Sequence, residues 1–167
     1  MENDKIRIFK SQDADTRSAT SEVTKDKLLS NTLSHILDVQ NVGQWLAEMF
    51  KDQLSQHDHT KIDYIDEFYK DFNEQLHSKD KPNFKEMPWF KNRHLTERHH
   101  LNDRVPDDVN LIDVLEMIVD CVMAGEARSG EVYEIVIEPD TITKAINNTQ
   151  KLLENNIEVV DSKPFDW

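Results

Sequence analysis

The sequence contains little of what a β-rich fold requires. It has three glycines and five prolines among its 167 residues, too few for the many turns of a β-sandwich or a β-barrel. Leu, Glu, Lys and Gln, which favour helices, are frequent instead. The shortage of turn residues therefore predicts a mainly α-helical fold.

Cysteine is almost absent. Cys121 is the single cysteine of the chain, which excludes an internal disulfide and a zinc cluster held by several thiolates. It stands within the apolar run 118–123, so we interpret it as a small buried residue rather than as a nucleophile.

Long apolar runs are also missing. No stretch approaches the roughly 18 apolar residues that span a bilayer, and the first twenty residues lack the apolar core of a signal peptide. We therefore expect no membrane partner and a cytoplasmic location.

Positive charge is in short supply. The 20 Lys and Arg residues face 33 Asp and Glu residues, and the net charge of −13 argues against tight binding to a nucleic-acid backbone. A small anionic substrate remains open, because a bound dication reverses the sign of the local potential.

Apolar residues recur at three- and four-residue steps in four stretches. This period predicts helices at about 26–51, 62–77, 111–124 and 140–155. The polar residues 1–24 are expected to form a flexible N-terminal arm, in which only Ile6, Ile8 and Phe9 hint at a strand. Residues 25–167 are expected to form a single helical domain, and the alternation of Val132, Ile135 and Ile137 predicts a short β element near 131–138.

The helix predicted at 111–124 carries three acids on one face. Asp113, Glu116 and Asp120 are three and four residues apart, and Asp120 interrupts an apolar run. An unpaired buried carboxylate is costly, so an Arg, a His or a metal ion must compensate it. In the alternative interpretation Asp113 caps the helix from Asn110, Glu116 is a surface acid and Asp120 is a salt-bridged structural acid.

Histidines supply further candidate ligands. The adjacent His57 and Asp58 suit borderline divalent metals. His94 and His99 do not share a face of a regular helix, because five residues turn through about 500°; if both are ligands, the helix must break between them. His35 aligns with the apolar stripe of its helix, and a solvated histidine-rich surface is the alternative for residues 94–100.

The order of these residues matters more than any one of them. A lone His, then His-Asp, then further His residues, then a lone Asp on an apolar helix resembles the HD superfamily of metal-dependent phosphohydrolases. The segment 57–61, HDHTK, is similar to the HD-x-[ST]-K element of small HD-like proteins that are common in bacteriophages. The segments 89–100 and 115–120 are similar to their tryptophan-and-histidine segment and their L-E-M-x-x-D helix.

The resemblance implies an HD-type helical bundle around one or two divalent metal ions, with Mn, Fe, Co, Ni, Zn and Mg as candidates. It implies that the primary metal ligands are His35, His57, Asp58 and Asp120. His94 and His99 (or His100) would hold a second metal or act on the substrate, one of them as a proton donor to the leaving oxygen. Lys61 would pair with phosphate, and Glu116 would orient a ligand imidazole.

The function implied is hydrolysis of a nucleotide or another small phosphate ester by a metal-activated water. The location would be the host cytoplasm if the protein is encoded by a phage. An acidic, metal-stabilised helical domain that engages a host protein without turnover is the alternative, and a purely structural domain is a third. Trp89, Phe90 and Trp167 are interpreted either as core or lid residues or as a homodimer contact.

Overall fold

The computed structural model describes residues 5–19 and 22–161, and it is mainly helical with one short two-stranded parallel sheet. This confirms the predicted fold class. The described residues form two compact units: residues 5–19, 22–49 and 150–161 make up the first, and residues 50–149 make up the second. None of the described helices is long and apolar enough to cross a membrane.

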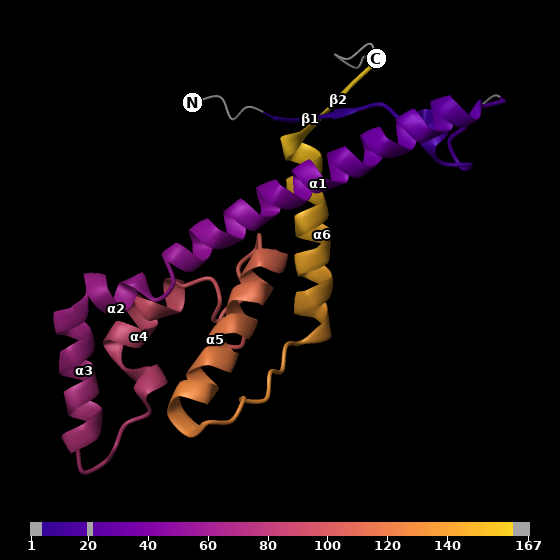
Figure 1. Cartoon of the computed structure of the whole chain (residues 1–167). Helices are drawn as coiled ribbons and strands as arrows, with labels where there is room; N and C mark the ends of the chain where they lie inside the picture. Colours follow the sequence, from indigo (N-terminus) through magenta and orange to yellow (C-terminus); the bar gives the residue numbers. More distant parts are fainter. Residues whose placement is uncertain (1–4, 20–21, 162–167) are drawn as a thin grey trace. The chain divides into compact units, whose positions relative to one another are not determined.

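The first unit contains the sheet. Strand β1 (Ile6–Phe9) pairs in parallel with β2 (Ile157–Val160), in a register that joins Ile6 to Ile157 (Figure 1). A short 3-10 helix, η1 (Gln12–Ala14), follows β1. The buried Asp38 carboxylate accepts a hydrogen bond of 3.1 Å from the backbone N–H of Phe9, which ties β1 to helix α1 (Lys25–Ser55).

The predicted position of the β element near 131–138 is wrong. Residues 131–138 form no strand. Ile135 and Ile137 are half-buried and Val136 between them is exposed, as alternation predicts, but Val132, which was grouped with the two isoleucines, is exposed as well. The segment is extended but has no strand beside it. The weaker indication of a strand at Ile6, Ile8 and Phe9 is confirmed instead, because these residues pair with β2.

The second unit holds the end of α1 and most of the remaining helices. These are α2 (His59–Asp63), α3 (Ile65–His77), η2 (Phe84–Glu86), α4 (Pro88–Asn92), η3 (His94–Thr96), α5 (Leu111–Ser129) and the first part of α6 (Pro139–Asn156). Three of the four predicted helices appear with small shifts of their ends. The one predicted at 62–77 begins earlier and is interrupted at Tyr64.

Helix α5 has the ends that its sequence specifies. Asn110 and Asp113 form a capping box, and Gly130 ends the helix in the left-handed conformation with φ 71°. The apolar side of α5 packs against α6 in a core of Leu101, Val109, Val114, Met117 and Ala145, with the half-buried Cys121 beside it. Helix α5 therefore presents its acidic side to the rest of the unit.

An aromatic cluster joins α3 to α4. Trp89 is 1% exposed and its ring stacks on those of Phe68 at 4.3 Å and His94 at 4.8 Å between centroids. The buried Asp71 carboxylate accepts a 2.7 Å hydrogen bond from the Trp89 backbone N–H. Trp89 and Phe90 are therefore interior residues rather than an exposed dimer contact, and Trp167 lies outside the described residues.

Candidate metal centre

Six histidine and aspartate side chains converge within the second unit. They form two sets of three, and within each set the ligand atoms lie within 4.8 Å of one another. We name His57, His99 and Asp120 the first ligand group, and Asp58, His94 and His100 the second ligand group. Every predicted metal ligand except His35 belongs to one of them.

The backbone brings these residues together at breaks between helices. His57 follows α1, and Asp58 adopts a left-handed conformation with φ 58° before α2 begins. This turn aims two adjacent side chains at one site. The expected break between His94 and His99 is present as well, since η3 ends at Thr96 and no helix continues to His99.

Glu116 orients the imidazoles of the first ligand group. Its Oε1 lies 2.9 Å from His57 Nδ1, with which it is hydrogen-bonded, and 3.1 Å from His99 Nδ1. Its Oε2 accepts a 2.7 Å hydrogen bond from Gln53 Nε2. Because Glu116 occupies the Nδ1 side of both rings, the Nε2 atoms are left to face the ligand site.

Asp58 lies between the two ligand groups. One of its oxygens is 3.5 Å from His57 Nε2, and the other is 3.7 Å from His94 Nε2 and 3.9 Å from His99 Nε2. His57 Nε2 is also 3.5 Å from Asp120 Oδ1. These separations are too long for hydrogen bonds but leave room for a cation among the atoms.

Two of the facing atoms are buried and unpartnered. Asp58 Oδ1 and His99 Nε2 have no hydrogen-bond partner in the described part of the chain, and the whole His99 side chain is 2% exposed. A buried polar atom without a partner costs free energy. A divalent cation would satisfy both atoms, so the residues fit a metal site.

The protonation states also suit metal binding. Burial, helped by His100 and Lys61, lowers the pKa of His94 to about 3, and burial together with His99 lowers the pKa of His100 to about 4. Both rings are neutral at pH 7, and a neutral imidazole has one nitrogen without a proton that can bind a metal. Burial opposes ionisation of Glu116, but its contacts with His99, Gln53 and His57 outweigh it and lower its pKa to about 2.

Opposing effects act on two further ligands. Burial disfavours a charged Asp58, yet the Lys61 ammonium beside it lowers the pKa of this carboxyl. Burial likewise disfavours protonation of His99, yet Glu116, Asp120 and Asp58 together raise the pKa of this imidazole. The shift of His99 reflects the negative charge of these three carboxylates, whereas the shift of Asp58 reflects the positive charge of Lys61.

A supporting network beneath the site was not predicted from the sequence. The fully buried Asp113 accepts hydrogen bonds from Arg98 Nε at 2.7 Å and from Arg98 Nη2 at 2.8 Å. Gln53 Nε2 also donates to Asp113 at 2.9 Å, and Thr60 Oγ1 is 3.0 Å from His94 Nδ1. One signal was present, since Asp113 shares a helical face with Glu116.

His35 is not part of the centre. It belongs to the first unit, its side chain is exposed, and it is in neither ligand group. The prediction that it lies on the buried side of its helix is wrong.

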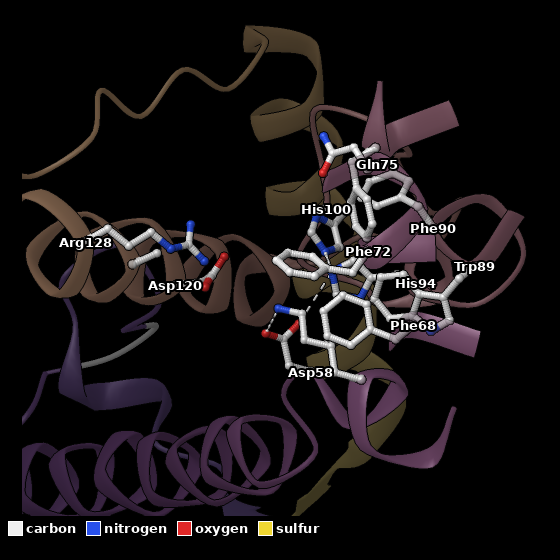
Figure 2. Close-up of a pocket in the computed structure, with 13 residues that line it drawn as sticks. Asp58, Phe68, Phe72, Gln75, Trp89, Phe90, His94, His100, Asp120 and Arg128 are labelled. Atoms are coloured by element: carbon white, nitrogen blue, oxygen red, sulfur yellow. Dashed lines mark hydrogen bonds and ion pairs between the residues drawn. The ribbon is translucent and has the colours of Figure 1, made fainter. Parts of the chain in front are cut away.

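A pocket of about 390 Å³ opens beside the second ligand group (Figure 2). Asp58, His94, His100 and Asp120 line it, with Asp120 on the α5 side and the two histidines beside the aromatic rings. The other lining residues are Lys61, Phe68, Phe72, Gln75, Phe84, Trp89, Phe90, Ala124 and Arg128. Lys61 Nζ donates a hydrogen bond to Asp58 Oδ2. The pocket thus combines carboxylates and imidazoles, two basic residues and an aromatic wall.

Comparison with known proteins gives this centre no counterpart. No protein-family model, curated protein or solved structure matches the chain.

Proposed function

We propose that the protein is a metal-dependent phosphohydrolase that acts on a small phosphate ester. The observation that carries the proposal is the pair of ligand groups, with the buried, unpartnered Asp58 Oδ1 and His99 Nε2 facing each other at 3.9 Å. A divalent cation among such ligands lowers the pKa of water toward neutrality and stabilises charge on phosphoryl oxygens. The resemblance to the HD superfamily supports the same reaction.

The side chains have separate roles in this proposal. The two ligand groups hold the cation or cations, and Glu116 fixes the imidazoles of His57 and His99. Lys61 and Arg128, both in the pocket lining, attract the phosphate dianion, and Lys61 must leave Asp58 in order to reach it.

The histidines serve better as ligands than as proton donors. His94 has a pKa of about 3 and is neutral at pH 7, so it has no proton to give to a leaving oxygen. His99 faces Glu116 with Nδ1 and the ligand site with Nε2. Neither ring is therefore suited to the acid role that the resemblance implied.

The pocket limits the substrate in size. A volume of about 390 Å³ accepts a small molecule, and the aromatic wall of Phe68, Phe72 and Trp89 suits a flat ring. A nucleotide is one candidate that meets both conditions.

The test is metal analysis and turnover on untagged protein. We expect copurified or added Mn²⁺ or Co²⁺ to support hydrolysis of a generic phosphodiester, a phosphomonoester or one of a panel of nucleotides. Asp58→Asn is expected to lower kcat at least about a hundredfold, since ligand loss removes the cation. Asp63→Asn, which changes an exposed carboxylate five residues away, is the matched control. Full activity of Asp58→Asn would refute the proposal.

A second candidate function rests on the net charge of −13. A metal-stabilised acidic domain that binds a host protein needs the ligand groups but no turnover. It predicts bound metal, no hydrolysis of any compound in the panel, and a basic binding partner.

A further inference from the structure

The two ligand groups differ in the charge that surrounds them. In the first group, the Asp120 carboxylate is joined by Glu116, whose Oε2 takes its hydrogen bond from the neutral amide of Gln53. In the second group, the carboxylate of Asp58 is ion-paired with the ammonium of Lys61. A cation therefore enters a more negative position in the first group than in the second.

The imidazoles of the two groups also have different orienting partners. His57 and His99 face a carboxylate with Nδ1, at 2.9 and 3.1 Å from Glu116 Oε1. His94 faces the neutral hydroxyl of Thr60 at 3.0 Å. A carboxylate partner makes an imidazole a more basic ligand, so this difference again favours the first group.

The ligand atoms of the second group are already engaged with other atoms. His94 Nε2 and His100 Nε2 lie 2.9 Å apart in a hydrogen bond, and Asp58 Oδ2 accepts from Lys61. A cation must replace both interactions. In the first group His99 Nε2 has no partner to lose.

The second group faces the pocket more fully than the first. All three of its members line the pocket, whereas Asp120 is the one member of the first group that does, and the His99 side chain is only 2% exposed. Phosphate oxygens in the pocket can therefore add ligands to a cation of the second group.

We propose that the first ligand group holds a tightly bound resident cation, and that the second is a low-affinity cation position completed by substrate phosphate. This inference rests on the proposed function and specifies how its metal centre is filled. The affinities should differ by at least about tenfold, because an orienting partner alone changes metal affinity by about 10- to 100-fold.

The test is a Mn²⁺ titration of the full untagged chain after metal removal, with free Mn²⁺ followed by electron paramagnetic resonance. We expect two classes of site at least about tenfold apart in Kd, with inorganic phosphate tightening only the weaker class. Asp120→Asn and His99→Ala should remove the tight class, and His100→Ala the weak one. Circular dichroism shows whether the variants are folded. Because Asp120 is half-exposed, Asp120→Asn still tests the tight class if His99→Ala unfolds.

Lys61 provides the sharpest variant. Removing its ammonium in Lys61→Met should tighten the weaker class severalfold and leave the tight class unchanged, while Lys70→Met, at an exposed lysine of α3, should change neither. A single class, two equal classes, or loss of the tight class in His100→Ala would overturn the inference. Absence of any Mn²⁺ binding by the folded protein would instead reject the proposed function from which it follows.

Discussion

At the scale of single residues, Gln53 holds the carboxylates beneath the metal centre. Its Nε2 donates to Asp113 at 2.9 Å and to Glu116 at 2.7 Å, two acids one helical turn apart that are 0% and 3% exposed. Arg98 compensates the charge of Asp113. Among the described residues Glu116 has no Lys or Arg partner, and its second oxygen depends on Gln53, so this amide fixes the carboxylate that orients His57.

Replacing Gln53 by Ala should loosen the first ligand group. The substitution leaves Glu116 Oε2 buried without its donor, which is expected to cost about 1–3 kcal/mol of unfolding free energy. Mn²⁺ affinity of the tight class should fall about tenfold. Urea unfolding of metal-free protein and Mn²⁺ titration measure the two effects. Gln56→Ala, at an exposed glutamine three residues on, is the control; equal behaviour of both variants would contradict the role assigned to Gln53.

Sequence spacing was enough to find most of the candidate ligands. His57-Asp58 and Asp120 were found because their residue types and order fit a metal site, and the structure brings them together with His94, His99 and His100. His35 was misjudged because an aligned apolar stripe does not say whether anything packs on it. Gln53 was missed because a glutamine in a sequence does not by itself indicate a role in a metal centre. Its role is visible only once the fold places its amide between two carboxylates.

At the scale of elements, the segment that follows helix α5 packs against the helix at Gly125. A Cβ on Gly125 would lie 2.5 Å from the carbonyl oxygen of Glu131 and 2.8 Å from the backbone N of Tyr133. Residues 131–133 therefore cross α5 at Gly125 in close backbone contact. The segment packs on a helix and pairs with no strand among the described residues, which alternation in the sequence could not distinguish.

Two glycine substitutions should have opposite effects on stability. Gly43 lies within α1 and a Cβ there meets nothing within 4 Å, so Gly43→Ala should stabilise by up to about 1 kcal/mol through helix propensity. Gly125→Ala gains the same propensity but collides with backbone, and should destabilise by about 1–3 kcal/mol. The midpoints of urea unfolding give the sign of the stability change for each variant. A shift in the same direction for both variants would show that the backbone of residues 131–133 leaves room for a Cβ at Gly125.

The helices were predictable because their period is local, whereas the sheet was not. The ends of α5 follow from Asn110, Asp113 and Gly130, all of which are readable in the sequence. Strand β1 pairs with β2 about 150 positions away along the chain. No local sequence pattern identifies such a distant partner. The prediction of a short strand in a polar segment is therefore weak until that partner is known.

At the scale of the whole molecule, excess negative charge and the metal centre are connected. The chain carries a net charge of −13, and part of it is concentrated around His57 and His99, where Asp58, Glu116 and Asp120 lie close together. Lys61 and Gln53 offset the mutual repulsion at Asp58 and Glu116, but within the described residues Asp120 has no Lys or Arg partner and only a 3.5 Å contact with His57 Nε2. A bound dication removes the repulsion at Asp120, so filling the centre should add to stability.

Metal removal should therefore destabilise the protein, and loss of a ligand should have opposite effects in the two states. At a Mn²⁺ concentration 100 times its Kd, the wild type should gain about 2.7 kcal/mol over protein in chelator. Asp120→Asn should lose this contribution of the tight class and keep only what the weaker class adds. In chelator, however, it should be as stable as the wild type or more stable, because one of the repelling charges is gone. Urea unfolding of both proteins with and without Mn²⁺ gives the four free energies. An Asp120→Asn variant less stable than the wild type in chelator would mean that Asp120 is held by the fold for packing, not for a cation.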